Sequence, residues 1–255
     1  MHSNLVIFNS LTRKEITRFL KVYHQAIISP VITGLIFFLI FRLATGNGVE
    51  KFSGLTYTVF VGSGIIVMTM MQQSFSNSSS SITISKVHGT IVDYLVTPIS
   101  SHNFVLSYSA ASIIRGLLVG ALLFPFINYF AHFKIHSPLI LMLSTILGVS
   151  LLSIFGVIVG LISQNFEQMS SFTSYLVTPL SFLSGTFYSI KKLPHYFESL
   201  NLINPLFYSI DLFRYGMTGY SDRGITEGLT ILFIANIALY LIAIRIFKTG
   251  YRIKE

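Results

Sequence analysis

Apolar residues in this chain occur in long blocks, and charged residues are concentrated between the blocks and at the two ends. No Asp, Glu, Lys or Arg lies between Lys21 and Arg42. As a helix this window is about 30 Å long, which matches the hydrocarbon thickness of a bilayer. Further apolar blocks follow at residues 57–71, 104–130, 139–162, 172–187 and 229–247. The pattern predicts an all-α polytopic membrane protein with six transmembrane helices, in a single transmembrane domain of residues 1–255.

Residues 5–21 predict an amphipathic helix before the first span. Apolar residues recur there at helical spacing, and Arg13, Lys14, Arg18 and Lys21 fall between them. A basic face opposite Phe and Leu side chains is typical of an interfacial helix that lies on the membrane surface. The alternative is a plain cytoplasmic helix that leads into the first span.

Residues 72–104 predict a cytoplasmic loop between the second and third spans. Residues 72–85 are rich in Ser, Asn and Thr, and they fit either a polar cytoplasmic extension of the second span or a pore-lining end of it. The loop also contains an acid, a short apolar run and a proline, in the order Asp93, Tyr94, Leu95, Val96, Thr97 and Pro98. Taken alone, this short sequence fits a generic turn between helices as well as a specialised element.

The stretch from residue 184 to residue 216 is interrupted twice by proline. It contains Gly185 and Phe187, then the pairs Leu193-Pro194 and Asn204-Pro205, and then Asp211 and Arg214. Proline lacks an N–H and disfavours helix at the residue before it, so each pair ends or kinks a helix. A broken helix beside apolar spans indicates irregular backbone at membrane depth, which is tolerated where protein or a water-filled cavity covers it.

Charged side chains also fall in or near apolar segments. Arg115 lies inside the block 104–130, where a charge is costly and usually faces protein or water. Asp211 stands one helical turn before Arg214, so a helix would place both on one face. The two side chains then either pair with each other, which lowers the cost of each charge near lipid, or both face exterior water.

Two pairs of glycines recur at a spacing of four. Gly116 and Gly120 lie in the block 104–130, and Gly156 and Gly160 lie in the block 139–162. Small residues at this spacing lie on one face of a helix and let a neighbouring helix approach closely. Because they are common in membrane spans, they predict close packing without indicating the partner helix.

Composition supports a membrane protein and excludes other classes. The 255 residues are 52% hydrophobic and 10% charged, against about 25% charged in soluble domains. The net charge is +8, and much of it lies at the chain ends, where it contacts anionic lipid or marks the cytoplasmic side. No nucleic-acid partner is therefore expected. Six spans would put both termini on one side, and the Lys and Arg near them indicate the cytoplasm.

No catalytic motif stands out in the sequence. The chain has no P-loop sequence, so it is not expected to hydrolyse ATP. No Ser/His/Asp set or carboxylate pair is recognisable, and His132 and His136 lack further ligands for a metal. We therefore expect neither enzymatic activity nor a metal or cofactor bound by this chain.

The Gly-x-Phe, Leu-Pro and Asn-Pro pattern with its downstream arginine resembles the signature of ABC-2 type transporter permeases, and the resemblance covers essentially the whole chain. It implies the transmembrane subunit of a bacterial exporter of drugs, lipids or polysaccharides, in the inner membrane with both termini cytoplasmic. Residues 188–224 would form an extracellular, re-entrant helical hairpin between the fifth and sixth helices. The matching residues are Gly185, Phe187, Leu193, Pro194, Asn204, Pro205 and Arg214.

The same resemblance assigns partners. Residues 93–98 correspond to the coupling helix, which contacts a separate ATP-binding subunit; family members often carry glutamate near the position of Asp93. Two copies of this chain would pair, and two copies of the partner would use ATP and Mg²⁺. The expected substrate is amphiphilic, such as a drug, a lipid or a lipid-linked glycan. The alternatives are an ATP-independent membrane scaffold, a secondary transporter and a lipid-modifying membrane enzyme.

Overall fold

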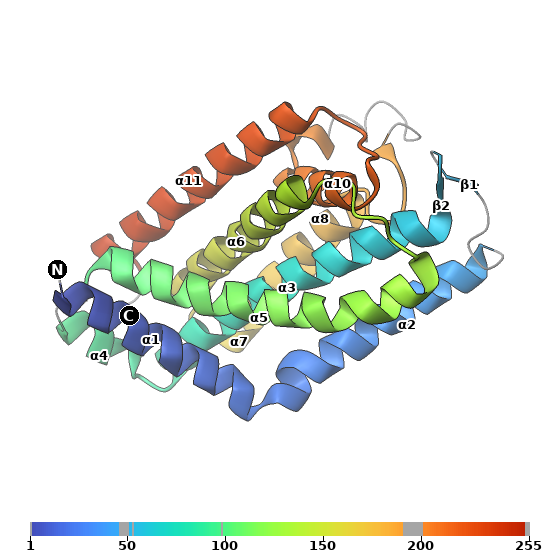
Figure 1. Ribbon diagram of the computed structural model, residues 1–255. Helices are drawn as coiled ribbons and strands as arrows, with labels where there is room; N and C mark the ends of the chain where they lie inside the picture. The colour runs from blue at the N-terminus through green and yellow to red at the C-terminus, as the bar shows by residue number, and fades with distance from the viewer. Residues whose placement is uncertain (1, 46–50, 53, 98, 191–200, 253–255) are drawn as a thin grey trace.

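The computed structural model describes residues 2–45, 51–52, 54–97, 99–190 and 201–252. Helices make up nearly all of this part of the chain (Figure 1). Their order is α1 (His2–Lys21), η1 (His24–Ile28), α2 (Ser29–Ala44), α3 (Tyr57–Val87), α4 (Ile91–Val96), α5 (Ser101–Ala131), α6 (Pro138–Ile162), α7 (Phe166–Phe172), η3 (Thr173–Val177), α8 (Thr178–Leu183), α10 (Pro205–Thr218) and α11 (Ile225–Thr249). Both η1 and η3 are short π-helical turns. A small antiparallel hairpin, β1 (Lys51–Phe52) and β2 (Leu55–Thr56), precedes α3.

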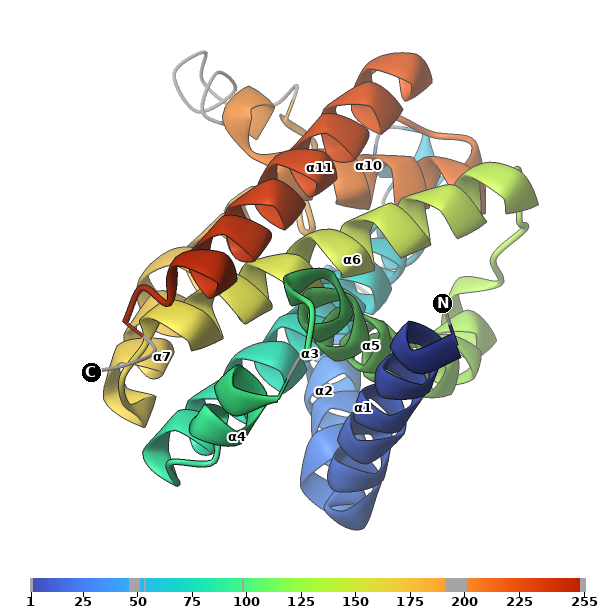
Figure 2. The ribbon, with the colours of Figure 1, turned by 90° about the vertical axis from the view of Figure 1, so that its left-hand side faces the viewer.

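The central element of the bundle is α3, which packs against α2, α5, α6 and α10. Figures 1 and 2 show α1 and α2 on one side of α3 and α11 on the other. Most side chains of α3 are buried, including Phe60, Phe75 and Ile82. A helix that is buried nearly all round needs neighbours that can approach it closely.

The glycine pairs of α5 and α6 provide this close approach, because both lie against α3. A Cβ atom at Gly116 would be 2.6 Å from the backbone oxygen of Met70, and one at Gly156 would be 2.5 Å from the backbone oxygen of Phe75. Both distances are well inside van der Waals contact, so the helices could not pack this closely around a larger residue. The tertiary structure thus identifies the partner helix that the glycine spacing left open.

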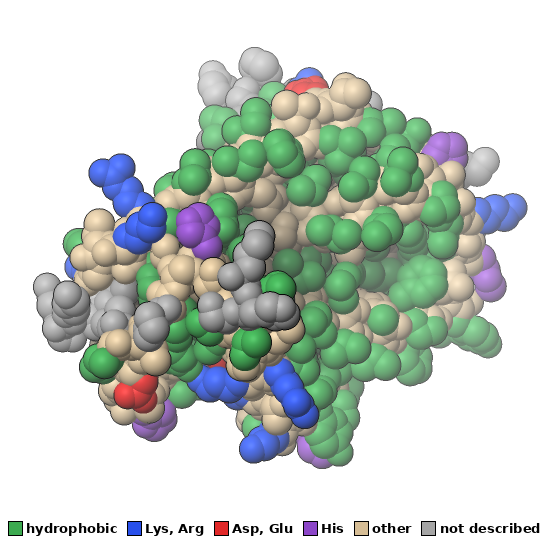
Figure 3. Space-filling view, turned by 60° about the vertical axis from the view of Figure 1, so that its left-hand side comes forward, with side chains coloured by type: hydrophobic (Ala, Val, Ile, Leu, Met, Phe, Trp, Pro, Cys, Tyr) green, Lys and Arg blue, Asp and Glu red, His purple; other side chains and the backbone are tan. Residues whose placement is uncertain are grey.

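Five helical segments of the described chain are long and apolar enough to cross a membrane, and they are His24–Ala44, Tyr57–Val87, Ser101–Ala131, Pro138–Ile162 and Ile225–Thr249. Figure 3 shows a broad apolar surface, with most Lys and Arg side chains at its margins. The fifth span predicted at residues 172–187 is not one of these segments. Its residues fall mostly in α7, η3 and α8, which follow one another without a break and end at Leu183. The count of six spans therefore stays a prediction.

Residues 72–85 continue the second predicted span, as both interpretations of this polar segment allow, because α3 extends to Val87. The boundary of the predicted loop at residue 72 is therefore wrong. The serines of this segment are bonded inside the bundle. Ser74 Oγ donates to the Val149 carbonyl at 2.7 Å, and Ser78 Oγ donates to the Ser153 carbonyl at 2.8 Å. Hydroxyls that bond across a helix interface can be buried in a membrane bundle. The connection between α3 and α5 is therefore short and consists of α4 and its flanking residues.

One end of the bundle carries the beginning of α1, α4 and the end of α11, and the other end carries the β hairpin and α10 (Figure 1). Throughout the range 5–21, α1 is helical as predicted, and it packs along α5. Phe19 on its inner face is completely buried, whereas Leu5 and Leu20 are exposed. This helix is therefore part of the bundle, and its position at a membrane surface stays a prediction.

Candidate functional site

The predicted signature residues that the structure describes meet around the junction where α8 ends and α10 begins. Gly185 has a φ of +72°, a left-handed conformation that favours glycine, and the chain turns there after α8. Asn204 is the N-cap of α10, and its Oδ1 accepts a hydrogen bond from the Leu206 N–H at 3.1 Å. The Asn204 Nδ2 donates to Ser184 Oγ at 2.8 Å and to the Leu180 carbonyl at 3.0 Å. One side chain thus starts α10 and fastens it to the end of α8.

Arg214 makes a second connection between α10 and the end of α8. Its side chain is completely buried, and its Nη2 donates to the Gly185 carbonyl at 2.7 Å. The guanidinium carbon lies 3.7 Å from the centre of the Phe60 ring, which is a cation–π contact with α3. Pro205 lies in the first turn of α10. A backbone N–H there has no acceptor within the helix, so the missing N–H of proline costs no hydrogen bond. The Asn-Pro pair and the arginine therefore act together in placing α10.

Phe187 links the signature region to α2. Its ring stacks on Phe41 with the ring centres 4.3 Å apart, and on Phe182 of α8 at 5.4 Å. Such stacked pairs stabilise a junction beyond the area that they bury. Leu193 and Pro194, the other predicted signature pair, lie outside the described residues.

Asp211 lies on the same helix as Arg214, and both are buried, so the alternative in which both face exterior water is wrong. Asp211 accepts hydrogen bonds from the N–H groups of Asp222 at 2.8 Å and Arg223 at 3.2 Å, and from Ser221 Oγ at 2.6 Å. Burial raises the pKa of Asp211, and the hydrogen bond from the Asp222 N–H opposes that shift. These bonds anchor the loop that leads to α11, and among the salt bridges of the described residues none joins Asp211 to Arg214.

The predicted coupling helix corresponds to α4. Residues 93–96 lie within this helix, Thr97 follows it, and Pro98 lies outside the described residues. The helix is short and sits at the end of the bundle that carries the start of α1 and the end of α11 (Figure 1). It is therefore placed at an end of the molecule, away from the middle of the apolar surface.

The two faces of α4 differ in character. Tyr94 points toward the bundle, where its hydroxyl contacts Lys14 Nζ and its ring meets the Phe104 ring edge-on at 5.8 Å. Val92 and Val96 lie one helical turn apart and are exposed, Val96 by 81%. The helix is thus anchored through an aromatic residue and presents apolar side chains outward.

A buried polar network that the sequence analysis missed joins α1 to α3. Glu15 is 1% exposed, and its Oε2 accepts hydrogen bonds from Arg18 Nε at 3.0 Å and from Ser81 Oγ at 2.6 Å. Arg18 Nη2 also donates to Asn77 Oδ1 at 2.9 Å. A buried carboxylate is stable only when it is paired and hydrogen-bonded in this way. The sequence feature that could have indicated this network is that Glu15 is the single acid in the basic segment 5–21.

Arg115 extends this network to α5 and to a cavity. Its Nε donates to the Ala26 carbonyl at 3.0 Å, its Nη1 to Asn77 Oδ1 at 3.4 Å, and its Nη2 to Gln73 Oε1 at 2.8 Å. The side chain is buried among α2, α3 and η1, so of the two surroundings that the sequence leaves open, protein or water, it has mainly protein. Ala26 lies in η1, a π-helical turn of the kind that is frequent at functional sites.

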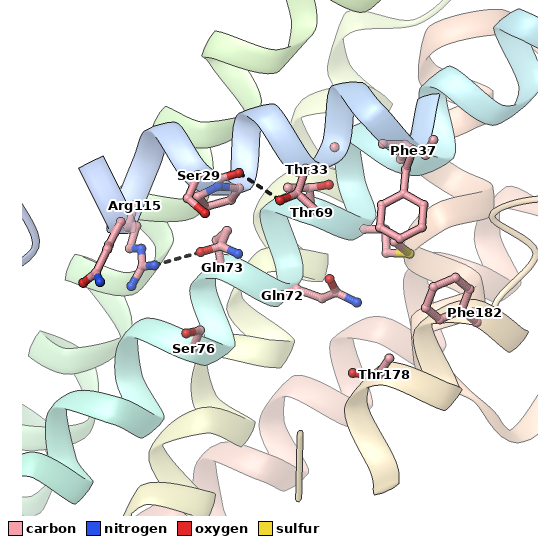
Figure 4. A pocket seen from close by; sticks show the side chains of 15 residues that line it. Ser29, Thr33, Phe37, Thr69, Gln72, Gln73, Ser76, Arg115, Thr178 and Phe182 are labelled. Atoms are coloured by element: carbon pink, nitrogen blue, oxygen red, sulfur yellow. Dashed lines mark hydrogen bonds between the residues drawn. The ribbon is translucent and has the colours of Figure 1, made fainter. Parts of the chain in front are cut away.

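The cavity has a volume of about 450 Å³ and lies among α2, α3, α5 and α8 (Figure 4). Figure 4 shows Arg115 at one end, and Phe37 and Phe182 at the other. The polar side chains that line the wall are Gln25, Ser29, Thr33, Thr69, Gln72, Gln73, Ser76 and Thr178. Among the lining residues in the described part of the chain, Arg115 carries the only charge. The cavity is therefore cationic and polar at one end and aromatic at the other.

A bundle of membrane-length apolar helices with a polar cavity among them defines the class of polytopic membrane proteins. Residues 7–218 match the ABC-2 type transporter family. The inner membrane transport permease YadH of Escherichia coli K12 is 32% identical over 250 residues, which cover 98% of each chain. Nodulation protein J of Neorhizobium galegae is 22% identical over 250 residues, 96% of this chain and 94% of that one. The chain therefore belongs to the ABC-2 type transporter family, as a multi-pass inner membrane permease subunit of an ABC transporter.

Proposed function

We propose that this permease is the membrane half of an exporter whose energy comes from a separate ATP-binding subunit. Two copies of the chain would form the path for an amphiphilic substrate, and two copies of the partner would use ATP and Mg²⁺. The observation that carries the proposal is the exposed apolar pair Val92 and Val96 on an anchored helix at one end of the bundle. Exposed apolar side chains on a fixed element suit docking into a groove of another protein.

The contacts of α4 provide a route from the proposed docking surface to the cavity. Tyr94 contacts Lys14 on α1, and the neighbouring Glu15 binds both Arg18 and α3. Arg18 and Arg115 then share the Oδ1 atom of Asn77. A displacement of α4 would therefore act on α1, α3 and α5 together. ATP can drive such a displacement only if its binding favours one of two arrangements of the helices.

The proposed topology has six crossings, with both termini in the cytoplasm. The continuous helical rod α7–η3–α8 is about 27 Å long at 1.5 Å per residue, which approaches the length of a span. The beginning of α1 and the end of α11 lie at the same end of the bundle. The second half of α1 carries Arg13, Lys14, Arg18 and Lys21, and the end of α11 carries Arg245 and Lys248. These features support a cytoplasmic location for that end. The largely buried α10 would form part of the re-entrant region on the opposite side.

The substitution Val96→Asp tests the docking surface. We expect it to reduce the amount of P-loop ATPase that co-purifies with the permease by at least about tenfold, because it puts a charge where an apolar contact is proposed. Mass spectrometry and ATP hydrolysis of the eluate measure the effect. Membrane insertion and the unfolding midpoint of the permease should not change, since Val96 is exposed.

The matched control is Val6→Asp, which changes an exposed valine of α1 at the same end of the bundle. It should leave the ATPase bound. Retention of the ATPase by Val96→Asp would contradict the coupling role of α4. If the wild-type permease instead works on a substrate with no ATPase present, an ATP-independent scaffold, a secondary transporter or a lipid-modifying enzyme replaces the proposal.

A further inference from the structure

The cavity carries a positive charge that the described residues around it leave unbalanced. Arg115 donates to a carbonyl and two amide oxygens, all of them neutral acceptors. The nearby acid, Glu15, already pairs with Arg18 and accepts from Ser81. None of the described residues that line the cavity carries a carboxylate. A buried cation in a membrane protein is costly unless an anion accompanies it, so the site favours an anionic occupant.

The hydrogen-bonding capacity of Arg115 is also only partly used. The three bonds that it makes employ its Nε and one N–H on each terminal nitrogen, so each terminal nitrogen retains a second N–H. A guanidinium with a free N–H on both terminal nitrogens can bind the two oxygens of a phosphate or a carboxylate as a fork. Gln72 and the hydroxyls of Thr69 and Ser76 line the same wall and can bind further oxygens.

The shape of the cavity adds a second requirement. Phe37 and Phe182 meet edge to face at the end opposite Arg115, with their ring centres 6.4 Å apart, and Ile65 and Met68 line the same space. This end suits an aliphatic or aromatic chain rather than a hydrated ion. The π-helical turn η1 borders the cavity through Gln25, and the carbonyl of its Ala26 accepts a hydrogen bond from Arg115. Such turns are frequent at functional sites.

We propose that this cavity binds an anionic amphiphile, with its anionic head group on Arg115 and its apolar chain against Phe37 and Phe182. The inference rests on the proposed permease function, and it deepens that function by assigning the charge of the substrate and its orientation. Arg115 is then a binding residue, and Gln73 and Asn77 are positioning residues that hold its guanidinium.

The test measures binding of radiolabelled dodecyl phosphate to the full-length permease in phosphatidylcholine nanodiscs, without nucleotide or partner. Unlabelled dodecyl phosphate should compete, whereas dodecanol and dodecyltrimethylammonium should compete at least about tenfold less well, because they lack the anion. Inorganic phosphate should also compete poorly, since it lacks the chain. Equal competition by dodecanol would overturn the anionic site, and equal competition by inorganic phosphate would overturn the amphiphile.

Variants locate the site. Arg115→Gln should weaken binding at least about tenfold, and Arg115→Lys, which keeps the charge, should recover part of the loss. The matched control is Arg42→Gln, which removes an arginine from a membrane helix outside the cavity and should leave binding unchanged. An equal loss in both glutamine variants would mean that general surface charge attracts the probe, and would overturn the site.

A second variant keeps the test decisive if Arg115→Gln does not fold. Gln72→Glu adds a carboxylate that faces the cavity without removing any bond of Arg115, and it should weaken dodecyl phosphate binding by repulsion. Unchanged binding in Gln72→Glu would contradict the proposal. Val96→Asp should bind the probe normally, so loss of coupling and loss of the cavity site give different results.

Discussion

Glu15 and Arg214 are both almost completely buried, and the protein compensates the two charges in different ways. Glu15 pairs with Arg18 one helical turn away and accepts a second bond from Ser81. Arg214 rests on the face of Phe60 and donates to a backbone carbonyl. Removing one partner of such a group costs more than the contact itself, because the remaining charge stays buried.

Asn204 offers a prediction at the residue scale. Asn204→Ala should lower the free energy of unfolding by about 2 kcal/mol, because it removes a helix cap and two hydrogen bonds to the end of α8. Thermal unfolding of the purified permease in detergent measures the loss. Transport should fall as well if the junction of α8 and α10 matters for function.

The control for this substitution is Asn165→Ala at the N-cap of α7. Asn165 accepts a hydrogen bond from the Gln168 N–H in the same way, at an exposed position. It should therefore cost only about 1 kcal/mol. Equal losses at the two positions would show that Asn204 contributes only as a cap and does not fasten α10 to α8.

At the scale of elements, α3 determines how the other helices pack. Serines along α3 donate to carbonyls of α6, and glycines on α5 and α6 let both helices approach its backbone. Lys86 at the end of α3 donates to the Leu161 carbonyl at 2.7 Å, so the ends of α3 and α6 are joined as well. A displacement of α3 would therefore change the packing of α5 and α6 at the same time.

Glycine substitution tests this packing. Gly156→Ala should destabilise the permease by about 1–3 kcal/mol, because its Cβ would lie 2.5 Å from a backbone oxygen of Phe75, which cannot move alone. Gly228→Ala in α11 is the matched control, since its Cβ would meet the leucine side chain of Leu212 at 3.1 Å. A side chain can give way by a few tenths of an ångström where a backbone oxygen cannot, and alanine favours helix, so this change should cost clearly less than Gly156→Ala. A neutral Gly156→Ala would argue against tight contact between α6 and α3.

At the scale of the whole molecule, the two ends of the bundle are chemically different. One end carries α4, the beginning of α1 and the basic end of α11, and the other carries the β hairpin and the loop that Asp211 anchors. Hydrophobic side chains cover much of the surface between them (Figure 3). This arrangement fits a molecule whose two ends meet water on opposite sides of a bilayer.

The topology can be tested directly because the chain has no cysteine. A single cysteine introduced as Thr56→Cys in β2 should react with an impermeant maleimide on intact cells. A cysteine introduced as Val96→Cys in α4 should react only after the membrane is permeabilised, because the two positions lie at opposite ends of the bundle. Labelling of Val96→Cys in intact cells would contradict the cytoplasmic location of α4 and of the proposed docking surface.

Much of the fold could be predicted from local properties of the sequence. Nearly all of the charge-free window between Lys21 and Arg42 lies within η1 and α2, and the N-cap and proline at residues 204 and 205 begin α10. The serines of residues 72–87 were harder to interpret, since a polar segment is equally a loop or a buried helix until its hydrogen-bond partners are known. The fifth span was placed by hydropathy alone, which does not detect a π-helical turn such as η3.

By itself the sequence determined the membrane class, the family signature and the breaks in the helices, because hydropathy and backbone restrictions act within short stretches of chain. Only the tertiary structure decided that Glu15, Asn77 and Arg115 form one network, and that the network ends at a cavity. These residues are far apart in the chain and belong to three helices. Their contacts depend on how α1 and α5 pack against α3, and no local pattern specifies that packing.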